Sequence, residues 1–233
     1  MICYDYIISK KHNELLNNEY ILKFKQLNNN NGNGNNKHNN LITINVENTI
    51  NLELNNLNNN NINIIYKNIN KYLKNNENNK VFLNLIINNS IIQHNNIDNY
   101  ILLYKKFYEY NKNYNNYIID YCYKIISNIK EDNYNYKDKY IGTYIFISKL
   151  YSNNIININK YDKFFSKIFI DTTDYIYELN LITYVKITNI VINILDKDLI
   201  NKYKDRIIYL SKNLENRRLR FLCMDILDII NCK

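Results

Sequence analysis

Residues 97–126 read IDNYILLYKKFYEYNKNYNNYIIDYCYKII. Apolar side chains recur in this stretch at intervals of three and four residues, first from Ile97 to Tyr108 and again from Tyr114 to Ile125. Such spacing gathers the apolar residues on one face of a helix, because an α-helix turns once every 3.6 residues. The stretch therefore predicts two amphipathic helices joined by a short loop.

The same period continues toward the C-terminus. It recurs in three further segments, 161–169, 203–214 and 219–230. Ile and Tyr individually favour strands, but a repeated helical period overrides that preference. We expect an all-α fold over residues 62–230, with about eight or nine helices stacked as antiparallel HEAT-like pairs in an α-α superhelix. An ordinary helical bundle is the alternative.

The first 61 residues differ in character. Residues 28–40 read NNNNGNGNNKHNN, a low-complexity tract that lacks the apolar residues of a core and is expected to be disordered. Residues 41–54, LITINVENTINLEL, alternate between apolar and polar and could form a short strand. Residues 55–61 are again rich in Asn. We interpret residues 1–61 as a partly disordered N-terminal arm and linker.

Composition reports codon bias as much as structure. The chain of 233 residues holds 52 Asn and neither Ala nor Pro, which is typical of A+T-rich codons. Its net charge of +8 is spread evenly along the chain. A positive surface favours weak, salt-dependent contact with RNA, whereas Lys enrichment by codon bias is the alternative explanation.

The sequence holds no recognisable motif for catalysis or for a cofactor. Cys3, Cys122, Cys223 and Cys232 are scattered without a CxxC pair, which argues against a disulfide framework or a zinc site and indicates a reducing compartment. No HExxH, P-loop or GxGxxG sequence occurs. Cys122 with His94 could form a nucleophile and base, but its place in an apolar stripe favours a buried role. We expect no enzyme, no cofactor, no metal, no membrane span, no secretory signal, and a cytoplasmic location.

Two segments contain residue types that the codon bias disfavours. Residues 141–151, IGTYIFISKLY, contain the only glycine outside the low-complexity tract. Residues 215–228, ENRRLRFLCMDILD, contain three of the four arginines. In a chain whose bias favours Lys, clustered Arg indicates a need for planar groups with several donors.

These segments resemble the middle domain of eukaryotic translation initiation factor 4 gamma. The glycine-bearing helix of that family is matched by Gly142, Phe146, Ile147, Leu150 and Tyr151, and its final helix by Arg218, Leu219, Arg220, Phe221, Asp225 and Asp228. Residues 97–126 resemble a third segment, and the likeness covers roughly residues 62–230. Only a short segment, 130–139, stands where the family usually has a long helical insertion, so a helix is missing or shortened there.

The resemblance implies a scaffold of translation initiation that binds a DEAD-box RNA helicase and, weakly, mRNA. It assigns helicase binding to Phe146, Arg218, Arg220 and Asp225. It makes Gly142, Ile147, Leu150, Phe221 and Leu222 signatures of the fold, and we expect Phe221 and Leu222 to fix the final helix to the others. An RNA-processing or decay adaptor, or a general protein-interaction solenoid, is the alternative.

A weaker likeness concerns the N-terminal arm. Tyr20, Ile21 and Leu22 resemble the end of the motif by which this family binds the mRNA cap-binding initiation factor. Leu16 stands where that motif has Tyr. A plain amphipathic turn is the alternative interpretation.

Overall fold

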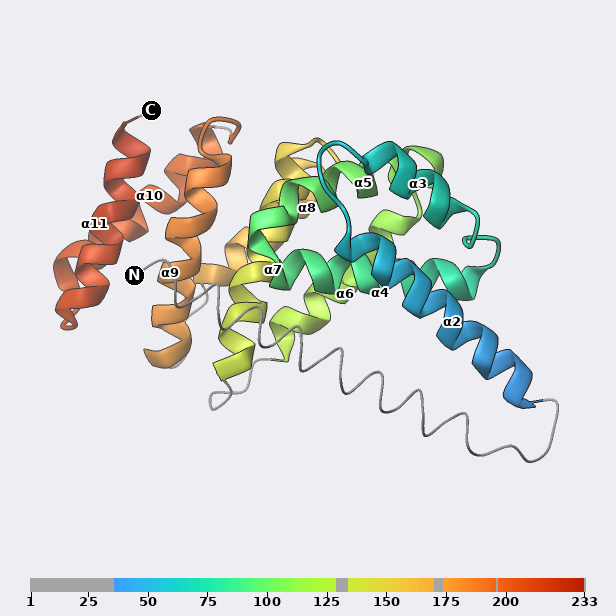
Figure 1. Ribbon diagram of the computed structural model, residues 1–233. Coiled ribbons are helices and arrows are strands. Elements are labelled where there is room, and N and C mark those ends of the chain that lie inside the picture. The colour runs from blue at the N-terminus through green and yellow to red at the C-terminus, as the bar shows by residue number, and fades with distance from the viewer. Residues whose placement is uncertain (1–35, 129–133, 170–173, 196, 233) are drawn as a thin grey trace. The chain divides into compact units, whose positions relative to one another are not determined.

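The computed structural model describes residues 36–128, 134–169, 174–195 and 197–232. Ten α-helices and two 3-10 helices account for nearly all of these residues, which include no strand (Figure 1). Their bounds are α2 Asn36–Asn55, α3 Ile62–Asn70, α4 Asn76–Ile92, η1 His94–Asn96, α5 Ile97–Tyr110, α6 Tyr114–Ser127, α7 Tyr134–Ser152, α8 Ile158–Phe165, η2 Ser166–Phe169, α9 Asp174–Val191, α10 Lys197–Asn213 and α11 Arg217–Asn231.

The chain divides into two compact units, residues 1–44 and 45–233. In the second unit neighbouring helices pack in pairs: α3 with α5, α4 with α7, α6 with α7, α7 with α9, α9 with α11, and α10 with α11. Figure 1 shows α9, α10 and α11 side by side, as these contacts require. The predicted all-helical fold with packed helix pairs is confirmed, and α3 to α11 fall within the expected number of helices.

The interpretation of residues 41–54 as a possible strand is wrong, because they belong to helix α2. A helical period of three or four residues is also present in this segment, at Val46, Ile50, Leu54 and Leu57. It overlaps with the alternation of apolar and polar residues that suggested a strand. Ile50 and Leu54 are fully buried. The expected disorder over 28–40 is also wrong for residues 36–40, which are helical, while residues 28–35 lie outside the described ranges.

Side-chain hydrogen bonds attach the second half of α2 to later helices. Asn68 Nδ2 donates to Glu53 Oε1 over 3.0 Å, and Asn89 Nδ2 donates to Asn51 Oδ1 over 3.3 Å. The Tyr100 hydroxyl contacts the carbonyl oxygen of Leu54 at 3.4 Å. The hydrophobic core therefore begins about one helix earlier than the expected start at residue 62.

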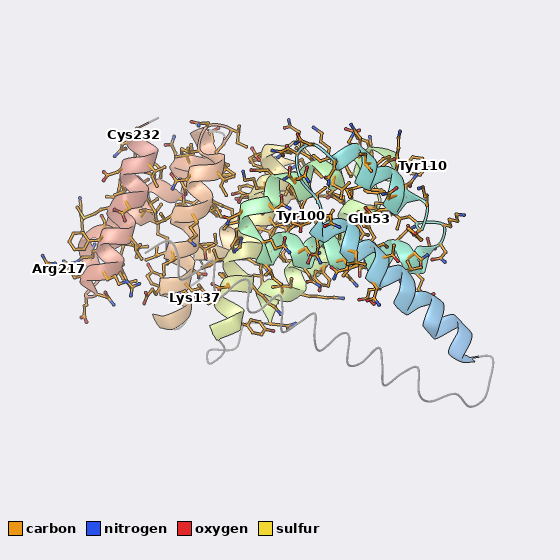
Figure 2. The ribbon with its side chains drawn as sticks, viewed as in Figure 1. Glu53, Tyr100, Tyr110, Lys137, Arg217 and Cys232 are labelled. Carbon is orange, nitrogen blue, oxygen red and sulfur yellow. The ribbon has the colours of Figure 1, made fainter. Side chains whose placement is uncertain are left out.

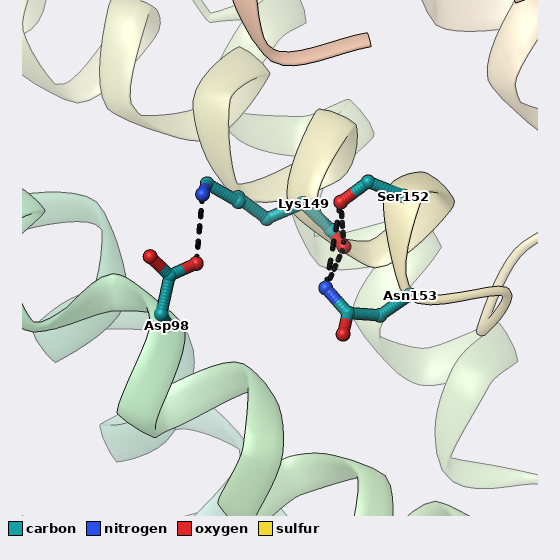
Figure 3. A network of polar contacts seen from close by, with 4 residues as sticks. All are labelled: Asp98, Lys149, Ser152 and Asn153. Carbon is teal, nitrogen blue, oxygen red and sulfur yellow. Dashed lines mark hydrogen bonds and ion pairs between the residues drawn. The ribbon is translucent and has the colours of Figure 1, made fainter. Parts of the chain in front are cut away.

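An ion pair joins α5 to α7 (Figure 3). Lys149 Nζ lies 2.7 Å from Asp98 Oδ1. The carbonyl oxygen of Lys149 also accepts hydrogen bonds from Ser152 Oγ at 3.0 Å and Asn153 Nδ2 at 2.9 Å. The same carbonyl also accepts a hydrogen bond from the backbone N–H of Asn153 at 3.1 Å, so the two side-chain bonds add to a helical bond at the end of α7. The ion pair links the last turn of α7 to the start of α5.

Gly142 permits a close approach between α7 and the end of α4. A Cβ atom built on Gly142 would lie 2.3 Å from the carbonyl oxygen of Ile91 and 2.8 Å from Cε1 of His94. The first of these distances is far below any normal carbon–oxygen contact, and the atom it meets belongs to backbone that cannot rotate away. Only glycine allows α7 to lie this close to the end of α4. This packing requirement explains why glycine is present here although the codon bias disfavours it.

Gly142→Ala is therefore expected to lower the free energy of unfolding by about 1–3 kcal/mol, because the added methyl group forces α7 away from α4. Thermal or urea unfolding followed by circular dichroism measures the change. Lys139→Ala, an exposed position in the same helix, serves as the control and should stay within about 0.5 kcal/mol. Equal stability of the two variants would contradict the close-approach role of Gly142.

Candidate functional site

Helix α11 has a well-defined start and a clear inner face. Asn216 caps it, since Asn216 Oδ1 accepts hydrogen bonds from the backbone N–H of Arg218 at 3.0 Å and of Leu219 at 3.4 Å. The buried side chains of the helix share one stripe: Leu219, Cys223, Ile226 and Ile230. This stripe faces α9 and α10 and leaves the opposite face of α11 to solvent.

The order of charges along α11 is the reverse of the order that stabilises a helix. Arg217, Arg218 and Arg220 occupy the first turn, and Asp225 and Asp228 lie in the second half. The helix dipole favours acids at the N-terminus and bases at the C-terminus, by about 0.3–1 kcal/mol for each exposed charge. This order of charges therefore costs helix stability. Such a cost indicates that these side chains serve a purpose other than forming the helix.

An exposed aromatic ring lies among these charges. Phe221 is 52% exposed, and the guanidinium carbon of Arg217 lies 5.7 Å from the centre of its ring. Arg217, whose place at the start of α11 is labelled in Figure 2, lines a shallow hollow of about 380 Å³ together with Arg218, Phe221, Leu222 and Asp225. We call these five residues the α11 surface. It combines an apolar centre with a basic end and an acidic end.

The expectation that Phe221 fixes the final helix to the others is not met. Phe221 follows Leu219 by two positions, which is more than half a helical turn, so its ring points away from the buried stripe. Leu222 is half-buried and packs against the core, as expected. The helix is held instead by the stripe of Leu219, Cys223, Ile226 and Ile230.

Arg218 links the α11 surface to α9. Its Nη1 atom lies 3.1 Å from Oε1 of Glu178, and the two side chains are 70% and 31% exposed. A pair this exposed adds at most about 1 kcal/mol to stability. Its main consequence is therefore geometric, because it holds one guanidinium at the edge of the hollow.

The structure brings together only some of the residues that the sequence selected. Arg218, Phe221, Leu222 and Asp225 line one hollow. Arg220 is half-buried and lies outside that lining. The other selected side chains lie in α7, where Phe146, Ile147 and Leu150 are buried in the core. Phe146 therefore has no exposed surface to offer a partner. Leu16, Tyr20, Ile21 and Leu22 lie outside the described residues.

Arg217 lines the hollow but was not among the residues predicted to bind the helicase. It lies four residues before Phe221, which places both side chains on the same outer face of α11. That spacing was visible in the sequence. The resemblance drew attention instead to Arg218 and Arg220, which flank Leu219.

Cys122 is a buried core residue, as its place in an apolar stripe predicts. The side chain is fully buried, and burial raises the pKa of the thiol far above its ordinary value. Burial likewise raises the pKa of Cys223 to about 11. Burial lowers the pKa of His94, an effect that Lys186 reinforces and Asp138 opposes. The two thiols are therefore protonated at neutral pH and poorly suited to act as nucleophiles.

The described residues contain no candidate metal site and no candidate membrane span. No cluster of three His, Cys, Asp or Glu side chains there is arranged to hold a metal ion. Among the same residues, no helix combines the length and apolar character that crossing a membrane requires.

The architecture therefore defines an all-helical protein of packed helix pairs with a charged, partly apolar surface on its last helix. No protein-family model matches the chain, and no curated protein sequence matches it. The likeness to the middle domain of initiation factor 4 gamma accordingly rests on the residues quoted above.

Replacing Phe221 and Leu219 one at a time tests which of the two side chains is exposed and which is buried in the core. Phe221→Ala should lower the free energy of unfolding by less than about 1.5 kcal/mol, because half of its ring is already in water. Leu219→Ala should cost about 2–5 kcal/mol, because its side chain belongs to the buried stripe. Urea unfolding of both variants measures the difference, and an equal or larger loss for Phe221→Ala would overturn the exposed placement.

Alkylation by iodoacetamide tests the state of the cysteines. Cys232 is exposed and should react in the native protein, whereas Cys122 and Cys223 should react at least about 100-fold more slowly until the protein unfolds. Mass spectrometry of tryptic peptides follows each site, and a urea-unfolded sample provides the control. Rapid labelling of Cys122 in the folded protein would contradict its buried, protonated state.

Proposed function

We propose that this protein is a non-enzymatic scaffold of translation initiation, located in the cytoplasm, that binds a DEAD-box RNA helicase through the α11 surface and contacts mRNA weakly. The observation that carries the proposal is the charge order of α11, in which arginines at the start and aspartates farther on flank an exposed phenylalanine. The resemblance of this helix to the final helix of the initiation factor domain supplies the kind of partner.

The α11 surface has the composition of a protein interface. Aromatic residues, Phe included, and Arg are enriched at interfaces relative to the rest of a protein surface. The guanidinium groups of Arg217 and Arg218 suit carboxylates of a partner, since Arg binds carboxylate with two parallel hydrogen bonds. Asp225, at the other end of the hollow, suits a Lys or Arg. Phe221 would be covered by the partner's apolar side chains.

A scaffold of this kind acts by shifting a conformational equilibrium. A DEAD-box helicase alternates between open and closed arrangements of its two domains. A partner that binds the closed arrangement more tightly raises its population by the ratio of the two affinities. No bond is made or broken by the scaffold itself. The fixed spacing of packed helices suits this task, because a rigid surface distinguishes two arrangements of its partner.

The contact with mRNA rests on charge. A net charge of +8 favours phosphate binding that weakens as salt rises, since bound counterions are released. The proposed contact for the cap-binding initiation factor lies in the N-terminal arm, at Leu16, Tyr20, Ile21 and Leu22.

An adaptor of RNA processing or decay, or a general interaction module, could use the same fold. Co-purification with initiation factors and ribosomal subunits favours the proposal, whereas decay or splicing proteins favour the alternative.

Pull-down of a DEAD-box initiation helicase tests the surface directly. Phe221→Ala and Arg218→Ala should each reduce helicase binding at least about tenfold while leaving the thermal midpoint nearly unchanged. Arg206→Ala, an exposed arginine of α10 outside the hollow, is the matched control and should bind normally. Normal binding by both α11 variants would refute this assignment of the surface.

A further inference from the structure

The outer face of α11 carries a symmetric arrangement of side chains. Phe221 and Met224, which are 52% and 49% exposed, lie at its centre. Arg217 lies about one turn before Phe221, Asp228 lies about one turn after Met224, and both are exposed. A helix advances by about 100° per residue, so all four lie within about 60° of one another, on the side away from the buried stripe. The midpoint of the apolar pair is therefore also the midpoint of the charged pair.

The charged groups of this face lack opposite charges at neighbouring positions of α11. No acid of the helix lies three or four residues from Arg217, and the residue at that spacing that carries a charge is Arg220. Asp228 likewise has Asp225 three residues before it. Like charges at this spacing repel each other, and the helix dipole disfavours both ends. A bound molecule that brings acids to the first turn and bases to the second half would relieve both effects.

We propose that two copies of this protein associate through α11, with the two helices antiparallel and related by a two-fold axis. An antiparallel copy presents its aspartates to the arginine end of the first helix and its arginines to the aspartate end. Arg217 then meets Asp228 of the second copy, and the two-fold axis repeats this contact at the other end. Phe221 and Met224 of both copies pack together in the middle, where thioether and aromatic ring suit each other.

A second charge pair fits the same arrangement. Arg218 and Asp225 lie seven residues apart, nearly one above the other, and both line the hollow next to Leu222. The two-fold axis keeps the same flank of each helix on the same side of the pair, so Arg218 comes within about 3 Å, along the helix, of the level of Asp225 of the second copy. Arg218 already lies 3.1 Å from Glu178, and its guanidinium has donors enough for a second carboxylate.

The expected association is weak and reversible. One helix from each copy makes a small interface, below about 1,200 Å², which is the size of transient complexes. Its charge pairs lie at the surface and are screened as salt rises. The dimer does not depend on the proposed function. Because it covers the α11 surface, it would compete with a helicase for that surface.

Sedimentation velocity of the full chain measures the association. At low salt the protein should sediment mainly as a dimer at about 200 µM and as a monomer at about 2 µM, as expected for a small interface. Adding about 1 M NaCl at the higher concentration should shift the protein toward monomer, because the charge pairs are exposed.

Opposite charge reversals test the antiparallel register. Arg217→Asp opposes Asp228 of the second copy with a like charge, so this variant alone should dimerise at least about tenfold more weakly. Asp228→Arg opposes Arg217 in the same way and should have the same effect. An equal mixture of the two variants should recover the dimer, because each altered end then meets an opposite charge. Both changes follow the preference of the helix dipole, so neither variant should unfold at a lower temperature than the unaltered protein.

Lys80→Asp is the control, since it makes the same change of charge at an exposed position of α4 and should dimerise normally. Monomeric behaviour of the unaltered protein at the higher concentration would overturn the proposal. A dimer that neither charge reversal weakens, or a mixture that associates no better than its separate components, would also overturn it.

Helicase pull-down at the lower concentration, where the chain is monomeric, keeps the two proposals apart. Helicase binding without dimerisation removes only this inference, and dimerisation without helicase binding removes only the helicase assignment.

Discussion

The architecture depends on the contact between Gly142 of α7 and the end of α4. With the carbonyl oxygen of Ile91 only 2.3 Å from where a Cβ would stand, no other residue type fits without moving a helix. α7 is central to the second unit, since it packs against α4, α5, α6, α8 and α9. A displacement of α7 would therefore be felt by most helix pairs at once. Interiors packed to crystal-like density have little room to absorb such a shift.

Around that contact, the chain builds its interior from an unusual set of residues. Without Ala or Trp, it fills the core with Ile and with whole tyrosines, several of them fully buried: Tyr100, Tyr104, Tyr144, Tyr161 and Tyr184. A buried hydroxyl needs a partner, and Asn or Ser often supplies it, as in the bond of 2.5 Å from Tyr140 to Asn180 and that of 3.1 Å between Tyr161 and Ser148. Codon bias toward Asn and Tyr thus yields cross-helix hydrogen bonds as well as bulk.

The α11 surface keeps an arrangement that does not favour folding. On α11 the charges oppose the helix dipole and Phe221 stays half in water. The amide oxygen of Asn115 is one of several buried polar atoms without a hydrogen-bond partner among the described residues. Many other local signals in the described chain agree with the fold, among them the Asn caps on α4, α8 and α11 and the buried apolar stripes. Local disagreement with folding is where function is most reasonably sought.

The sequence by itself determined that the second unit is helical, because apolar residues at 3.6-residue spacing can be buried only on one face of a helix. It also marked Gly142 and the Arg217 to Arg220 cluster, since both resist the codon bias. It could not decide whether residues 41–54 form a strand or a helix, because their apolar residues fit both a two-residue and a 3.6-residue period. The burial of Ile50 and Leu54 against other helices favours the helix. Tertiary structure alone placed Phe146 in the core and Phe221 outside, and it brought Asn115 to the carbonyl of Ile155, 40 residues away. The exposure of a side chain and its contacts with distant residues depend on which helices pack together. The helical period predicts which face of a helix is apolar, but not which other helix packs against that face.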